Sequence, residues 1–170
     1  SKKQLDIIVA NSKENLFFMS DFLLFKDYLY AWRYMGRFEK PDFASYTYQG
    51  FSLQWLLGKA YKESNQSYFY YAILMERAIM RMKELDVDIC LFVDWFENQS
   101  YDKSVYYAMH QYYPEAKVHG YMGFIADSTI FPHIIASNKE LFCHIAPKDI
   151  YLCSSYLLKF YQNYNGYKHI

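Results

Sequence analysis

The chain has 170 residues with 18 basic and 18 acidic side chains, so its formal net charge at pH 7 is zero. Because binding to duplex nucleic acid depends on concentrated positive charge, this balance argues against a nucleic-acid partner. Although 53% of the residues are hydrophobic, they include 20 tyrosines and 14 phenylalanines, and no apolar run approaches the roughly 18 to 20 residues of a membrane-spanning helix.

The cysteine and histidine patterns predict a cytoplasmic protein without a structural metal. Cys90, Cys143 and Cys153 make an odd number with no close pair, which is typical of reduced intracellular thiols. The polar start of the chain lacks the features of a secretory signal. The histidines have no metal-ligand spacing with one another or with the cysteines.

The first half of the chain is predicted to be rich in helix. The run of residues 5–10, in which Ile7, Ile8 and Val9 are continuous, indicates a strand covered on both faces, and Ser12 is a candidate N-cap for a helix that reaches about Tyr34. This helix is apolar on nearly every side, which is typical of a helix that is buried or covered by a partner. Residues 51–61 are predicted to form a second helix.

Ser67 is predicted to cap a third helix, in which Met75 and Met82 fall on an apolar stripe beneath a charged face. We interpret these methionines as core residues rather than as a functional surface. No glycine- or serine-rich linker follows, so we expect one domain over residues 1–170.

The second half alternates short strands with helices. Strands are predicted at residues 89–93, 117–121 and 150–153, and a helix is predicted to begin after Ser100 and run to Tyr113. Ser137 and Glu140 form a candidate capping box, and Ser154 is a candidate cap of a last helix that ends near Gly166. This alternation predicts an α/β fold, a Rossmann-like three-layer sandwich with a short, mainly parallel sheet and a helix-rich N-terminal half.

Candidate functional residues follow the predicted strand at residues 89–93. In open α/β sheets, ligands bind beyond the carboxyl ends of the strands. One of the carboxylates of Asp94 and Glu97 could act as a general base towards a hydroxyl, while the amides of Asn98 and Gln99 orient the substrate. The alternative is that both carboxylates cap the following helix and face solvent.

A second group of candidates follows the next predicted strand. His119 is a weaker candidate for catalysis, because a lone histidine at a strand end is more often structural. Tyr121 lies beside it, and the glycines of this segment, including Gly123, would let a ligand approach the backbone closely. Ser154 and Ser155 could bind an anion at a helix N-terminus, although as N-caps they need no ligand.

Four short segments resemble bacterial proteins of surface-carbohydrate biosynthesis. The segments are Glu97-Asn98-Gln99 with Asp102-Lys103, Tyr112-Tyr113-Pro114, Lys117-Val118-His119-Gly120-Tyr121 and Ala146-Pro147-Lys148-Asp149-Ile150-Tyr151. Their order and spacing are similar to those of two-domain GT-B glycosyltransferases of O-antigen and capsule assembly, over roughly half of the chain. The chain departs from the family pattern at Met122 and Gly123, where the family has Gln-His.

The resemblance implies that residues 1–170 form the N-terminal, acceptor-side domain of such a transferase, with Glu97 as the candidate base. A carbohydrate or lipid-linked saccharide would be the acceptor. The nucleotide-sugar donor would bind a C-terminal domain beyond Ile170, so this domain needs no cofactor of its own and the isolated chain is expected to be inactive. The resemblance also implies work at the inner face of the cytoplasmic membrane, by peripheral association.

Two other functions are compatible with the same residues. A non-catalytic interaction or scaffold domain of the same fold is the main alternative, because the departure at Met122 and Gly123 removes a family histidine. A receiver-like regulator would share the acidic strand end, but such domains have more regular strand–helix pairs than residues 12–85 offer.

Overall fold

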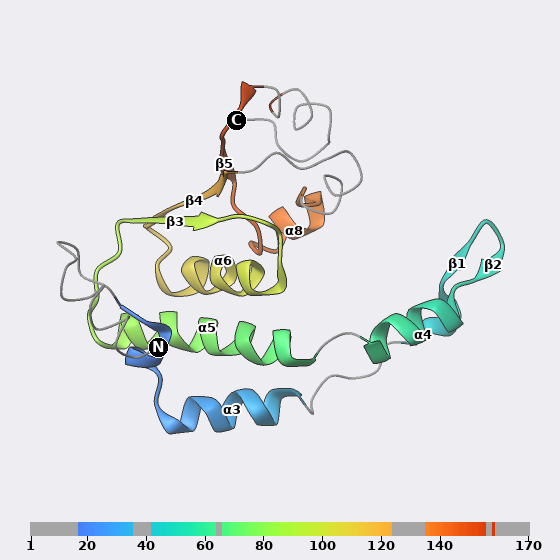
Figure 1. Cartoon of the computed structure of the whole chain (residues 1–170), viewed down its shortest axis with the longest axis horizontal. Coiled ribbons are helices and arrows are strands. Elements are labelled where there is room, and N and C mark those ends of the chain that lie inside the picture. The colour runs from blue at the N-terminus through green and yellow to red at the C-terminus, as the bar shows by residue number, and fades with distance from the viewer. Residues whose placement is uncertain (1–16, 36–41, 64–65, 124–134, 156–157, 159–170) are drawn as a thin grey trace.

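The computed structural model describes residues 17–35, 42–63, 66–123, 135–155 and 158. Figure 1 shows a stack in which α3 lies beneath α5, α5 beneath α6, and α6 beneath the sheet. The chain is therefore a mixed helix and strand protein with a small parallel sheet, as the alternation predicts. The predicted strand at residues 5–10 and most of the predicted helix after Ser154 lie outside the described residues.

Two helices replace the first predicted one, within its described part. They are α2 (Met19–Phe22) and α3 (Phe25–Met35), and the extended backbone of Leu23 separates them. The reason lies in the acidic residues of their first turns. The carboxylate of Asp21 accepts a hydrogen bond from Phe18 N at 2.8 Å, and that of Asp27 accepts one from Leu24 N at 3.0 Å. Each acid thus satisfies an N–H group that a new helix start leaves without a partner.

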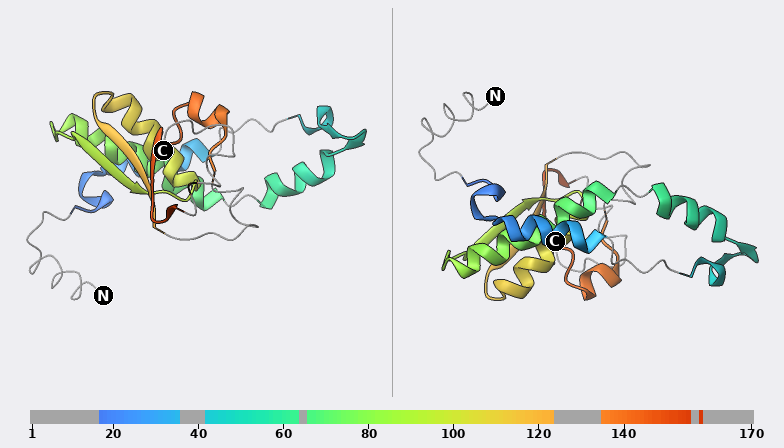
Figure 2. Two further views of the ribbon diagram at one scale, coloured as in Figure 1. Left: turned by 90° about the horizontal axis from the view of Figure 1, so that it is seen from above. Right: turned by 90° about the horizontal axis from the view of Figure 1, so that it is seen from below.

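Residues 42–63 extend away from the stack (Figures 1 and 2). The prediction of a helix over residues 51–61 is wrong in its first residues, which belong to a hairpin. Its turn contains Gln49 and Gly50 with φ of 48° and 83°, a left-handed backbone that glycine adopts readily. The elements of this segment are η1 (Phe43–Ser45), β1 (Thr47–Tyr48), β2 (Phe51–Ser52) and α4 (Gln54–Glu63).

The helices α5 (Gln66–Glu84) and α6 (Ser100–Tyr112) form the centre of the stack. The predicted amphipathic pattern of α5 is confirmed, because Ile79 is buried and Met75 and Met82 pack partly buried against the cluster around it. Ser67 lies inside this helix rather than before it, since α5 already begins at Gln66. The same cluster contains Val105, Ala108 and Met109 of α6.

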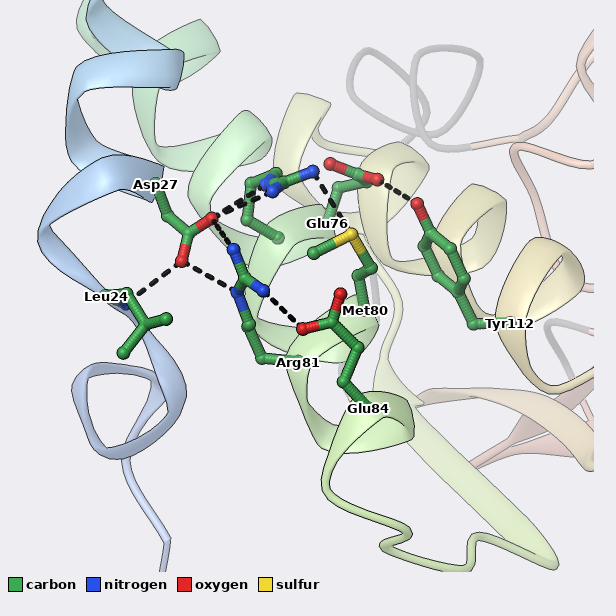
Figure 3. A network of polar contacts seen from close by, with 8 residues as sticks. Leu24, Asp27, Glu76, Met80, Arg81, Glu84 and Tyr112 are labelled. Carbon is green, nitrogen blue, oxygen red and sulfur yellow. Dashed lines mark hydrogen bonds and ion pairs between the residues drawn. The ribbon is translucent and has the colours of Figure 1, made fainter.

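A network of polar contacts joins α3 to α5 and α5 to α6 (Figure 3). Asp27 of α3 is fully buried, and its carboxylate accepts hydrogen bonds from both Arg77 and Arg81 of α5. On the next face of α5, Glu76 accepts a hydrogen bond of 2.6 Å from the hydroxyl of Tyr112. These contacts bridge residues that are far apart in the sequence.

The sheet contains β3 (Leu91–Trp95), β4 (Lys117–Met122) and β5 (Asp149–Leu152), in that order and all parallel. The predicted parallel sheet is thereby confirmed. β3 begins and ends two residues later than expected, so that Asp94 and Trp95 belong to the strand rather than to the loop after it. The register places Trp95 beside Tyr121 and Tyr121 beside Tyr151.

The chain enters β5 through α8 (Asn138–Phe142), and its predicted capping box is confirmed. Ser137 Oγ accepts a hydrogen bond from Glu140 N at 3.3 Å, and Ser137 N donates to a Glu140 carboxylate oxygen at 2.7 Å. Ser137 and Glu140 therefore begin the helix together, as the spacing of a capping box requires.

The two faces of the sheet differ within the described residues. Met122 and Ile150 are buried in a cluster with Tyr106 of α6. Gly120 lies on this covered face, where a Cβ atom would be 2.8 Å from Pro147 Cγ. Because successive side chains of a strand point to opposite faces, the neighbouring residues form a second face, which we call the open face. Its exposed large side chains are Leu91, Val93, Trp95, Tyr121 and Tyr151.

Among the described helices, none combines the length and the apolar character that crossing a bilayer requires.

Candidate functional site

The segment after β3 presents a carboxylate at the carboxyl end of the sheet. Glu97 is half-buried, and its Oε1 accepts a hydrogen bond of 2.8 Å from the indole Nε1 of Trp95. Phe96 anchors the segment from below, because its side chain is fully buried and its N–H donates to Tyr121 O at 2.9 Å. Glu97 is therefore held in one orientation by the last residue of the strand.

Asp102, in the first turn of α6, shapes the loop that carries Glu97. Its Oδ2 accepts hydrogen bonds from Glu97 N at 3.0 Å and from Gln99 N at 2.9 Å. Between these residues Asn98 has a φ of 56°, in the left-handed region that asparagine tolerates better than most residues. The capping role that the sequence leaves open for Asp94 or Glu97 thus belongs to Asp102.

Asp94 points to the covered face of the sheet, towards α6. Burial raises its pKa to about 6, the charge of Asp102 adds to this rise, and hydrogen bonds from Tyr106 and from the backbone of Trp95 oppose it. Burial also raises the pKa of Asp102. Asp94 Oδ2 is buried and has no hydrogen-bond partner within the described part of the chain. Asp94 is thus placed beneath the sheet, away from the side chain of Tyr121.

Tyr121 and Gly123 lie beside Trp95. The rings of Trp95 and Tyr121 meet edge to face, with centroids 5.7 Å apart and planes at 73°. A Cβ atom on Gly123 would be 2.6 Å from Trp95 Cη2 and 2.7 Å from Tyr121 Cε1, so the missing side chain makes room for this aromatic pair. Met122 is fully buried, which places this departure from the family pattern in the core.

His119 lies on the open face, two residues before Tyr121. Its ring packs edge to face against Tyr151 with centroids 5.1 Å apart, and its Nδ1 is 3.7 Å from Asp149 Oδ2. Because His119 and Asp94 occupy opposite faces of the sheet, they cannot act on the same reacting atom. His119 instead lines a cleft of about 550 Å³ together with His110 and His144.

The structure therefore divides the predicted site residues into three groups. Glu97, Tyr121 and Gly123 surround Trp95 at the carboxyl end of the sheet, and Asn98 and Gln99 form the adjoining turn. Asp94 lies on the covered face, and His119 belongs to the cleft.

Two smaller cavities lie elsewhere. One of about 500 Å³ is formed by residues 42–62, and one of about 380 Å³ lies between α3, α5 and α6. None of the three cavities is lined by Asp94, Glu97, Asn98 or Gln99. The described residues contain no group of three or more histidine, cysteine, aspartate or glutamate side chains that could hold a metal ion.

Sequence reasoning missed the roles of Trp95 and Asp102. The signal for Asp102 is present, because an acidic residue three positions after a helix cap can accept the N–H of the cap residue. Gln99 and Asp102 have this spacing. The indole contact has no comparable signal, since it depends on how the loop turns after the strand. No family model, curated protein or solved structure matches the chain.

Proposed function

We propose that the chain is the acceptor-side, Rossmann-like domain of a glycosyltransferase in bacterial surface polysaccharide synthesis. The observation that supports this proposal best is the hydrogen bond from Trp95 Nε1 to Glu97 Oε1 at the carboxyl end of β3. It orients a carboxylate beside an exposed aromatic pair, at the edge of the sheet where ligands of α/β proteins bind.

The two parts of this arrangement suit a saccharide acceptor. Trp95 and Tyr121 offer apolar ring surfaces with polar atoms at their rims, and both are partly exposed. A sugar ring has the same character, with apolar C–H faces and hydroxyl groups around its edge. Glu97 Oε2 has no hydrogen-bond partner among the described residues, so it is available to an acceptor hydroxyl.

In the proposed reaction, Glu97 accepts the proton of the acceptor hydroxyl while that oxygen forms the new glycosidic bond. The nucleotide leaves from a donor that binds a second domain outside this chain. Asn98 and Gln99 are proposed to orient the acceptor from the turn beside Glu97, which Asp102 holds in shape. The proposed acceptor is a carbohydrate or a lipid-linked saccharide at the inner, cytoplasmic face of the membrane.

Binding and transfer can be tested separately. In the isolated chain, a panel of bacterial oligosaccharides is titrated while the indole and tyrosine NMR signals are followed. We expect Trp95→Ala to abolish binding and Trp55→Ala to leave it unchanged, because Trp55 is an equally large exposed side chain on the distant helix α4. Loss of binding in both variants, or in neither, would contradict the proposed acceptor site.

Transfer requires the longer protein that carries a donor domain. We expect Glu97→Gln to lower its turnover by about 100-fold, the usual contribution of a general base, while saccharide binding to the isolated chain persists. The amide of this variant keeps an oxygen that can accept from Trp95, so the substitution removes only the basic group. Unchanged turnover in the variant would move the base elsewhere.

The second candidate, a non-catalytic interaction domain, is favoured by the open face. Leu91, Val93 and Tyr151 are each more than half exposed, although parallel sheets are normally covered on both sides. The test uses Leu91→Ser and Val93→Ser. If these variants change the oligomeric state or weaken binding of the proposed second domain, and saccharides do not bind the wild-type chain, the interaction domain is the better description.

A further inference from the structure

We propose that the cleft at the amino-terminal ends of β4 and β5 binds a phosphate-bearing small molecule. This cleft lies away from the loop of Glu97, and the proposal does not depend on the glycosyltransferase proposal. Its volume of about 550 Å³ is in the usual range for small-molecule sites.

Two connections of the fold build the cleft. The end of α6 and the turn into β4 form one wall, and the segment that leads from α8 into β5 forms the other. His144 has a φ of 56°, and its N–H donates to Leu141 O at 3.2 Å just after α8 ends. The following N–H, of Ile145, donates to Glu140 O at 3.1 Å. The backbone that places the imidazole of His144 in the cleft is therefore fixed by the end of a helix.

The lining is rich in groups that can carry positive charge. Lys117 and Lys148 contribute ammonium groups, and neither has an ion pair within the described part of the chain. Asp149 is the one carboxylate among the lining residues. The remaining polar or titratable side chains that face the cleft are His110, His119, His144, Tyr106, Tyr113 and Tyr151.

Two of the histidines are stacked on each other. The rings of His110 and His144 are 3.7 Å apart with planes at 16°. Partial desolvation lowers the pKa of His110, and the charges of His144 and Lys148 lower it further. An anion in the cleft would oppose this repulsion, so its binding would be coupled to proton uptake by His110.

The third histidine, His119, lies against the one carboxylate that lines the cleft. His119 Nδ1 is buried and makes no hydrogen bond with any described residue, and its nearest acid, Asp149 Oδ2, is 3.7 Å away. The stacked geometry of the other two rings disfavours a metal, because the lone pairs of parallel rings do not converge on one ion.

Charged donors of this kind favour phosphate oxygens, because hydrogen bonds between ionised partners are stronger than neutral ones. The volume exceeds what a single inorganic phosphate fills, and the tyrosines that line the cleft can pack against an attached organic group. The chemical class is therefore a phosphate ester or diphosphate. A nucleotide and a sugar phosphate are the two sources of that chemistry.

The proposal is tested by titrating the full chain with inorganic pyrophosphate and following the histidine and backbone NMR signals. We expect saturable shifts confined to the cleft, and an affinity that falls about tenfold in Lys148→Gln. The matched control is Lys26→Gln, since Lys26 is an exposed lysine of α3 that lines none of the three cavities and should bind as the wild type does. Equal losses in both variants, or no saturable shifts, would overturn the proposal.

The proton coupling is tested with sulfate, which keeps its charge between pH 5.5 and 7.5. We expect sulfate to bind more tightly as the pH falls, and this dependence to weaken in His110→Asn and His144→Asn. A pH-independent affinity in the wild-type chain would contradict the role of the stacked pair. Comparing a nucleoside diphosphate with a hexose phosphate then separates the two sources, and equal weak binding of every anion would show a non-selective basic surface and overturn the site.

Discussion

Arg81 donates to both carboxylate oxygens of Asp27, with Nε 2.9 Å from one oxygen and Nη2 2.9 Å from the other. The carboxylate is fully buried, and it also accepts from Arg77 Nε and Leu24 N. Burial alone would raise the pKa of Asp27, but the hydrogen bonds from Arg81, Leu24 and Arg77 bring it well below its usual value. This one side chain begins α3 and also fastens it to α5 (Figure 3).

We expect Asp27→Asn to destabilise the chain by about 3 kcal/mol at pH 7, because the buried Arg81 then keeps only the exposed Glu84 as a carboxylate partner among the described residues. Urea denaturation measures this change. The control is Asp21→Asn, which alters an exposed helix-start contact of α2 and should cost about 1 kcal/mol or less.

The same variant has a defined pH dependence. Since the folded-state pKa of Asp27 is lowered, its contribution is complete above the unfolded-state pKa of about 4 and is lost as the pH falls below that value. The stability difference between wild type and Asp27→Asn should therefore shrink below about pH 4. A difference that stays constant from pH 7 to pH 3 would show that the carboxylate charge is not what stabilises the contact.

We expect Asp94→Asn to stabilise the chain at pH 8. The pKa of Asp94 is raised to about 6, so the folded state is penalised whenever this carboxyl is ionised. The free energy of unfolding should rise by about 1 to 2 kcal/mol. This is less than the full pKa shift of Asp94 would give, because the carboxyl group is only partly shielded from solvent. The gain should decrease as the pH falls through 6 and vanish near pH 4. Thermal unfolding at several pH values measures it, and Asp88→Asn, at an exposed position, is the control that should show no such trend.

Trp95→Phe separates the two roles proposed for Trp95. The ring remains for stacking on a sugar, but the N–H that orients Glu97 is removed. We expect saccharide affinity of the chain to change by less than about threefold, and transfer by the proposed two-domain transferase to fall by about tenfold, because a misoriented base loses part of its effect. If the saccharide affinity falls but the turnover of bound acceptor does not, the indole contributes to binding and does not orient Glu97.

Tyr112→Phe tests the contact between α5 and α6. The hydroxyl donates to Glu76 at 2.6 Å, and both burial and this carboxylate raise the pKa of Tyr112. We expect a loss of about 1.5 to 3 kcal/mol in the free energy of unfolding, the value of a hydrogen bond to a charged group. Tyr107→Phe on the exposed side of the same helix should change stability by less than about 0.5 kcal/mol. Equal effects in the two variants would assign the loss to helix propensity rather than to the contact.

Much of the second half could be predicted because its signals are local. Ser137 and Glu140 begin α8 as a capping box predicts, and β4 begins at Lys117 as expected. The errors in the first half are also local in origin. Asp21 and Asp27 look like ordinary polar residues of a long helix, but each one begins a new helix by accepting the N–H three residues before it.

The sequence by itself determined the alternation of strands and helices, the parallel sheet and the position of the polar segment after β3, because hydrophobic periodicity and capping act between neighbours in the chain. Only the tertiary structure decided that Asp94 and His119 lie on opposite faces, that Asp102 holds the Glu97 loop, and that His110 stacks on His144. β3 lies two residues further along the chain than predicted, which places Asp94 inside the strand. Asp27 and Arg81 are 54 residues apart in the sequence and meet only when the helices pack. Such contacts depend on strand register and helix packing, which no short stretch of sequence specifies.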